Sequence, residues 1–244
     1  GLIMQLVKDV FDERVADIES YFELVNNVEL AIGSGGAIFS VNGTQYQINP
    51  DQQKIMYSGI YLHLYNLVES TISMLIDAVE RHAAQGINGQ LVLLTENMKK
   101  LYVKSVAAPF ESINNDLRLE KALELFDQVL NIKPLELRIP PGGGGNWDLK
   151  EIERISKSIG VDVTLPRALR AMVNAPFRDD KGPIRLVKEI RNKLAHGSLS
   201  FTQCGTNHVA SDFRRLIDIV KEYLAHIIRS YENFITAQGY KIAQ

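Results

Sequence analysis

The sequence has a single cysteine, no long apolar run and little net charge. One thiol, Cys204, cannot form an internal disulfide, which is typical of proteins of the reducing cytoplasm. Cys204 follows a turn-like stretch without activating neighbours, so a role as a nucleophile is not favoured. No apolar run of about 18 residues occurs, so a membrane-spanning helix is not expected. The formal net charge of −2 excludes a strongly basic coat, and any contact with nucleic acid must come from a local patch.

Common catalytic and cofactor motifs are missing as well. The glycine run at 142–145 is followed by Asn146 and Trp147 rather than by Lys-Ser/Thr, which excludes a phosphate-binding P-loop. Cys-x-x-Cys, His-Glu-x-x-His and Gly-x-Ser-x-Gly patterns do not occur. The histidines lack the spacing of metal ligands: they are His63, His82, His196, His208 and His226. We therefore expect neither a metal nor a cofactor.

Amphipathic helical periodicity covers most of the chain. With 244 residues, 45% of them hydrophobic, the chain can bury a substantial core. Apolar residues at spacings of three and four predict helices. The expected ranges are 6–30, 51–81, 96–105, 117–131, 148–160, 166–173, 183–196 and 212–236. These ranges predict an all-α protein with one domain over 1–244.

Two segments interrupt the helical pattern. Asn42-Gly43 lies between two alternating runs, which predicts a small β-hairpin insertion over about 37–48. Pro-Pro followed by four glycines predicts a Gly-rich loop over 140–146, with Trp147 anchoring it to the helices. The segment 132–139 fits either a strand or an extended loop.

The residues best suited to catalysis lie at the end of the expected helix 183–196, in the run Arg-Asn-Lys-Leu-Ala-His from Arg191 to His196. Histidine titrates near neutrality and can take or give a proton. Arginine stays charged and can bind phosphate with a planar fork. The two groups suffice for metal-free RNA cleavage, in which a base activates the 2′-hydroxyl and a cation stabilises the charged phosphoryl oxygens.

Positive charge is concentrated around this run. Eight basic and three acidic residues lie between Arg167 and Lys193, although the whole chain is slightly acidic. A local basic segment suits a polyanionic substrate. Within it, Arg185, Lys188 and Lys193 are the expected substrate-binding residues.

The spacing itself leaves a problem and an alternative. Five positions on a helix correspond to a rotation of about 140°, so Arg191 and His196 do not share a face, whereas Asn192 and His196 do. A joint site needs a distorted helix end or two chains packed together. The alternative is a purely structural role, in which Arg191 and His196 only stabilise the helix C-terminus.

Polar and aromatic residues of the expected helix 51–81 also have two interpretations. Asn66 and Glu69 could line the site and hold Arg191 or His196, or they could form a buried polar pair that fixes helix packing. The latter is favoured from the residues alone. Tyrosines recur every four residues, at Tyr57, Tyr61 and Tyr65. These rings, like that of His63, are more typical of a core or interface than of base stacking.

The run from Arg191 to Gly197 resembles the Arg-x4–6-His motif of HEPN domains (higher eukaryotes and prokaryotes nucleotide-binding). The segments Phe11–Tyr21, Leu64–Thr71 and Gly145–Gly160 are similar to the bacterial MAE-type HEPN family. The resemblance implies a helical bundle that dimerises to bring two motifs into one cleft. In this resemblance, Arg191 binds the phosphate, His196 acts as base or acid, and Asn192 orients His196 or the substrate.

The resemblance further implies a metal-independent endoribonuclease, a toxin or phage-defence effector with RNA as substrate and an antitoxin or defence protein as partner. Two alternatives stay open. One is a non-catalytic HEPN module that binds RNA, nucleotide or a partner protein, and the other is a helical dimerisation domain of a larger system. Retention of both Arg191 and His196 favours the enzyme.

Overall fold

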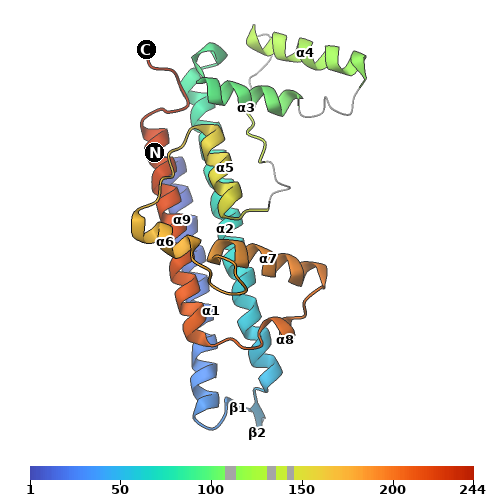
Figure 1. Ribbon diagram of the computed structural model, residues 1–244, viewed down its shortest axis with the longest axis vertical. Coiled ribbons are helices and arrows are strands. Elements are labelled where there is room, and N and C mark those ends of the chain that lie inside the picture. The colour runs from blue at the N-terminus through green and yellow to red at the C-terminus, as the bar shows by residue number, and fades with distance from the viewer. Residues whose placement is uncertain (108–113, 131–135, 142–145) are drawn as a thin grey trace. The chain divides into compact units, whose positions relative to one another are not determined.

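The computed structural model describes residues 1–107, 114–130, 136–141 and 146–244, and it is predominantly helical (Figure 1). The prediction of an all-α protein with a small hairpin is confirmed. The helices are α1 (Leu2–Gly33), α2 (Pro50–Ile87), α3 (Glu96–Ala107), α4 (Asn115–Val129), α5 (Leu149–Ile159), α6 (Arg167–Asn174), α7 (Pro183–His196), α8 (Phe201–Cys204) and α9 (Ala210–Thr236), with a short 3-10 helix η1 (Leu91–Leu93). None of the described helices combines the length and the apolar character needed to cross a membrane.

The chain divides into two compact units. Unit 1 comprises residues 1–5, 72–164 and 226–244, and unit 2 comprises residues 6–71 and 165–225. Helices α1, α2 and α9 contribute residues to both. The division therefore does not follow element boundaries, and the single domain over 1–244 stays a prediction.

Unit 2 is organised around aromatic side chains of α2 and α9. Tyr57, Tyr61 and Tyr65 of α2 are all buried, which confirms their assignment to the core. The ring of Phe213 on α9 stacks on Tyr57 at 5.5 Å and meets the edge of Tyr61 at the same distance. Offset and edge-to-face aromatic pairs add specificity to the hydrophobic stabilisation, so these contacts fix how α2 and α9 pack.

In unit 1, helix α5 begins and ends where the sequence predicts. The Asp148 carboxylate accepts a hydrogen bond from the Glu151 amide at 2.9 Å, and Gly160 ends the helix in the left-handed region at φ 101°. Trp147 is buried beside this start. The glycines at 142–145, and residues 132–135 of the ambiguous segment, lie outside the described residues, whereas 136–139 are neither helix nor strand.

The predicted hairpin connects α1 to α2. Strands β1 (Ile38–Val41) and β2 (Thr44–Gln47) are antiparallel, and both turn residues, Asn42 and Gly43, have positive φ as a type I′ turn requires. The rings of Phe39 and Tyr46 form a cross-strand pair at 5.1 Å. Both strands are exposed, and no charged residue occurs between Glu29 and Asp51.

A charge network ties α1 to α9 within unit 2. Arg214 donates two hydrogen bonds to Glu19, at 2.6 and 2.7 Å, and Lys221 donates a third at 2.9 Å. The Arg214 bonds first, and then Lys221, lower the pKa of Glu19 from 4.5 to about 2. Ionised Glu19 therefore stabilises the fold above pH ~4.5, and this contribution is lost as the pH falls toward 2.

We expect Glu19→Gln to lower the free energy of unfolding at pH 7 by only about 1 kcal/mol, because Glu19, Arg214 and Lys221 all stay partly exposed and screened. In urea denaturation the difference from wild type should shrink as the pH falls from about 4.5 toward 2. Glu13→Gln on the same helix is the control, since Glu13 has no ion pair among the described residues. A difference that is constant with pH would contradict the assignment.

Candidate functional site

Helix α7 positions the Arg-x4-His run on its solvent side. Pro183 occupies the first turn, where its missing amide proton costs nothing. The predicted apolar stripe is buried, which anchors the opposite face of the helix; it consists of Ile184, Val187, Ile190 and Leu194. Gly197 ends the helix at φ 75°, and the Leu199 amide donates to the Lys193 carbonyl at 3.3 Å. His196 is thus the last residue of α7.

The helix is α-helical through His196. Of the two ways to build a joint site, a distorted helix end is therefore not what the structure has. Arg191 and His196 stay about 140° apart around the helix axis. One copy of α7 presents the two side chains to different sides.

Arg191 is held by two contacts within unit 2. Its guanidinium carbon lies 4.6 Å from the centre of the Tyr65 ring, a cation–π distance. Its Nη1 donates a hydrogen bond to Oδ1 of Asn192 at 3.1 Å. The side chain is half-buried, and among the described residues no carboxylate pairs with it.

The structure brings Asn192 together with Arg191 rather than with His196. His196 is exposed and makes no hydrogen bond to any residue in the described ranges. Asn192 and His196 share a helix face but stay separate in this state. The imidazole is therefore open to solvent and to an incoming substrate.

The expected substrate-binding residues lie around the same helix. Arg185 and Lys193 are exposed and Lys188 is half-buried. Arg185, Lys188, Asn192 and His196 are three or four residues apart in succession, so they line one side of α7. A polyanion that follows this side would meet two cations, an amide and an imidazole.

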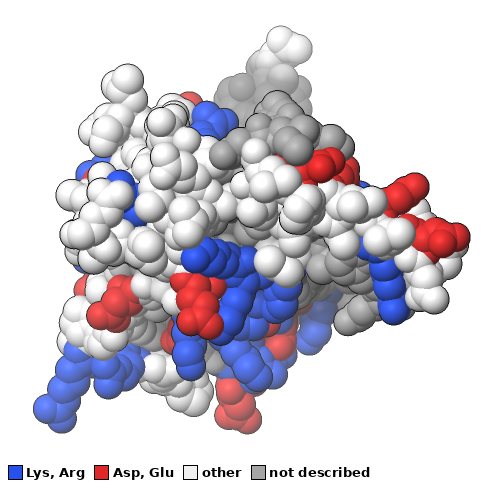
Figure 2. All heavy atoms as spheres, turned by 90° about the horizontal axis from the view of Figure 1, so that it is seen from above, with Lys and Arg blue, Asp and Glu red and all other residues white. Residues whose placement is uncertain are grey.

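An acidic side chain interrupts the basic character of this surface. Glu189 accepts ion-pair contacts from Lys181 at 2.5 Å and from Arg185 at 2.8 Å. Lys181 first, and then Arg185, lower the pKa of Glu189 from 4.5 to about 2. Acidic side chains also stand among basic ones on the face drawn in Figure 2. Lys181 and Arg185, two of the basic residues counted between Arg167 and Lys193, are therefore paired with a carboxylate in this structure.

Asn66 and Glu69 lie on α2, one and four residues after Tyr65. Asn66 is exposed and Glu69 is half-buried, so a buried polar pair is not what the structure has. Neither side chain bonds to Arg191 or His196 within the described part of the chain. Their role in lining a site stays a prediction. The aromatic partner of Arg191 is instead Tyr65, for which the tyrosine spacing predicted only a place in a core or interface.

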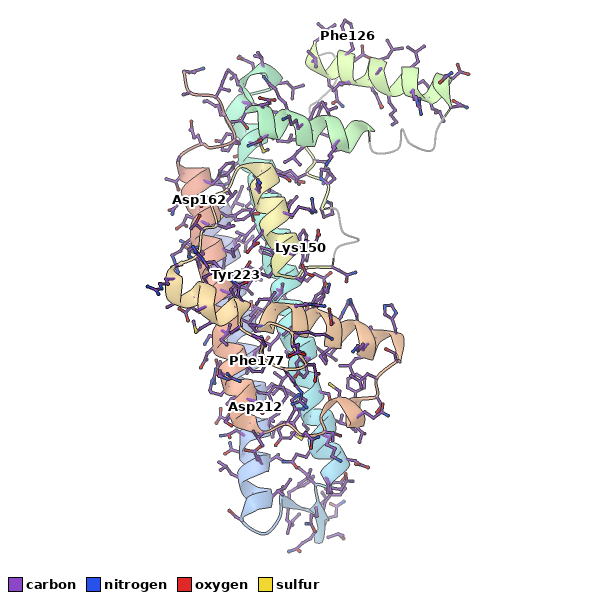
Figure 3. All side chains as sticks on the ribbon, in the orientation of Figure 1. Phe126, Lys150, Asp162, Phe177, Asp212 and Tyr223 are labelled. Atoms are coloured by element: carbon purple, nitrogen blue, oxygen red, sulfur yellow. The ribbon has the colours of Figure 1, made fainter. Side chains whose placement is uncertain are left out.

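A second polar cluster in unit 2 surrounds His208. The Tyr61 hydroxyl lies 2.7 Å from Nε2 of His208, and Nδ1 lies 2.9 Å from the Thr206 carbonyl oxygen. Burial lowers the pKa of His208, which favours the neutral ring. A cavity of about 70 Å³ adjoins this ring and is lined in part by Phe177 and Asp212, both labelled in Figure 3. Nothing in the sequence distinguishes His208 from the other scattered histidines.

The other residues with reactive side chains are accounted for by burial or packing. Within the described ranges, no three His, Cys, Asp or Glu side chains gather as a metal site. Cys204, the last residue of α8, is buried, and burial raises its thiol pKa. His63 packs on the ring of Tyr21 at 4.6 Å, as expected of a packing histidine.

The described chain is a helical protein with an Arg-x4-His run at the capped end of a helix, which agrees with what the resemblance to HEPN domains implies. The model of the HEPN_MAE_28990-like HEPN family matches residues 4–240, and the chain belongs to this family. The resemblance to MAE-type HEPN proteins is thereby confirmed. No curated protein and no solved structure matches the chain.

Proposed function

We propose that this protein is a metal-independent endoribonuclease whose site is built from Arg191, Asn192 and His196. The observation that carries the proposal is the arrangement on α7. A guanidinium held by a ring and an amide, with no carboxylate partner among the described residues, is followed on the same helix by an exposed imidazole. Membership of the HEPN family supports it, because HEPN modules are often nucleotide-binding or RNase-like.

The proposed reaction needs one base, one cation and one acid. His196 takes the proton of the 2′-hydroxyl, and the 2′-oxygen attacks the adjacent phosphorus. Arg191 binds the phosphoryl oxygens, whose charge grows in the transition state. The bond from phosphorus to the 5′-oxygen breaks, and that oxygen takes a proton. The products are a 2′,3′-cyclic phosphate and a free 5′-hydroxyl.

We also propose that two chains form the working site. Arg191 and His196 point to different sides of a regular helix. A second copy can place its His196 beside the first copy's Arg191 and supply the proton that the 5′-oxygen needs. A homodimer with a composite site therefore agrees with the geometry of α7. The toxin or phage-defence role, and an antitoxin or defence protein as partner, belong to this same proposal.

The first test is cleavage of total RNA and of tRNA in EDTA, beside the His196→Ala variant. Cleavage by wild type alone, with 2′,3′-cyclic phosphate ends, would support the proposal. Cleavage that needs added metal would contradict metal independence. RNA binding without cleavage, in both proteins, would favour the non-catalytic alternative.

Replacement of Glu189 is expected to strengthen RNA binding, whereas His196→Ala is expected to slow RNA cleavage. We expect Glu189→Gln to tighten RNA binding several-fold at low salt, because it removes a negative charge that lies beside Lys181 and Arg185 and repels phosphate. The gain should decline as salt is raised. Fluorescence anisotropy with a labelled RNA measures both quantities.

The matched control for Glu189→Gln is Glu151→Gln in unit 1, which removes the same charge from a pair with Arg154 at 3.0 Å. If the two variants changed RNA affinity equally, net charge rather than this cluster would be responsible.

A further inference from the structure

We propose that Tyr65 is a positioning residue that fixes the plane of the Arg191 guanidinium, so that one edge of the group is presented to a substrate phosphate. The proposal rests on the proposed RNase function for its consequence in catalysis. Its structural part can be tested without RNA.

The Tyr65 ring is held in place by burial. Tyr65 is 2% exposed and lies on α2, in the same buried row as Tyr57 and Tyr61. A ring packed in a core has little freedom to move. With the guanidinium carbon 4.6 Å from the ring centre, the flat cation has a rigid surface on one side.

A hydrogen bond restrains rotation of the Arg191 guanidinium. The bond from Nη1 to Oδ1 of Asn192, 3.1 Å long, fixes one corner of the group. The ring and the amide together restrain a side chain that is otherwise highly flexible. The opposite edge, formed by Nε and Nη2, has no hydrogen-bond partner among the described residues. These two atoms form one of the parallel donor pairs with which arginine binds phosphate.

Unit 2 contains an internal comparison that shows what such an arrangement binds. Arg214 also lies over a ring, that of Phe22, at 4.8 Å. There the Nε and Nη2 edge of the guanidinium donates to both oxygens of the Asp218 carboxylate, at 3.3 and 2.7 Å, and Glu19 binds through Nη1 and Nη2. Arg191 repeats the ring and the cation without a carboxylate in the described part of the chain. We infer that an oxyanion of the substrate takes, at the Nε and Nη2 edge of Arg191, the place that Asp218 takes at Arg214.

The test compares Tyr65→Leu, which removes the ring, with Tyr65→Phe, which keeps it. Protons of the Arg191 side chain over the ring should show an upfield ring-current shift in NMR spectra of arginine-labelled protein. We expect the shift in wild type and Tyr65→Phe, and its loss in Tyr65→Leu. In the cleavage assay, kcat/KM should fall about tenfold for Tyr65→Leu and stay within about twofold for Tyr65→Phe.

Tyr57→Leu is the control for the loss of a buried ring, because Tyr57 is 3% exposed on the same helix and its ring stacks on Phe213. Circular dichroism and the Tm of each variant establish that it is folded. In an Arg191→Ala background, Tyr65→Leu should have no further effect on cleavage, since Tyr65 acts through Arg191.

The proposal is overturned if Tyr65→Leu keeps the Arg191 shift, or if it and Tyr57→Leu reduce cleavage equally. It is also overturned if Tyr65→Leu loses the shift and cleaves RNA at the wild-type rate. Absence of cleavage by the wild type counts against the proposed function instead, and the NMR shift then decides whether Tyr65 fixes Arg191.

Discussion

Replacement of His196 by alanine is expected to slow RNA cleavage about a hundredfold to ten-thousandfold, the range over which a general acid–base group contributes. The imidazole is exposed at the end of α7 and makes no hydrogen bond to a described residue. Its removal should therefore leave the unfolding free energy within about 0.5 kcal/mol of wild type. Single-turnover cleavage of labelled tRNA in EDTA measures the rate, and urea denaturation measures the stability.

The control for His196→Ala is Ser198→Ala, which perturbs the same helix end. The Ser198 hydroxyl donates to the Lys193 carbonyl at 3.3 Å, so its loss affects the helix terminus but no proton-transfer group. We expect wild-type cleavage from Ser198→Ala. Equal losses in the two variants would show that the helix end, rather than the imidazole, supports cleavage.

Replacement of Arg191 by alanine should slow cleavage about a hundredfold to a thousandfold, as is usual when a donor to a developing oxyanion is removed. Arg191→Lys should recover only part of the rate, because an ammonium keeps the charge but loses the planar fork. The same tRNA assay measures both variants. Arg215→Ala is the matched control, since the Arg215 guanidinium lies 4.3 Å from the Phe177 ring and outside the motif.

Mixing the two inactive variants tests the composite site. If Arg191 of one chain works with His196 of the other, a heterodimer of Arg191→Ala and His196→Ala retains one such pair, with a single imidazole for both proton transfers. We expect the mixture to recover part of the activity that neither variant has alone. A mixture that stays inactive although heterodimers form would place both residues of a working site in one chain.

Helix ends were the most predictable part of the fold. Gly160 and Gly197 lie in the left-handed region, as the stop signals after their helices indicated. Asp148 and Pro183 mark helix starts for equally local reasons. Local chemistry decides such ends, so one sequence suffices to find them. Helix α2 continues to Ile87, six residues beyond the predicted end; it passes through Gly86 and ends before Asn88 and Gly89, which both have positive φ.

The partners of the motif residues could not be predicted in the same way. The Tyr65 ring is 126 positions from Arg191 in the chain and meets it only through tertiary packing. Helical spacing grouped Asn192 with His196, whereas the flexible arginine beside Asn192 reaches its amide oxygen first. The ion pairs of Glu189 likewise depend on Lys181, which lies before the helix begins.

The burial of Cys204 has a practical consequence for measuring how unit 2 opens. It is the only cysteine in the sequence, and its thiol is 5% exposed with a pKa raised by burial. A thiol reagent can therefore modify the folded protein only at one position, and only when the surroundings of α8 separate. The labelling rate of native protein thus reports local opening beside the α7 motif, without any introduced probe.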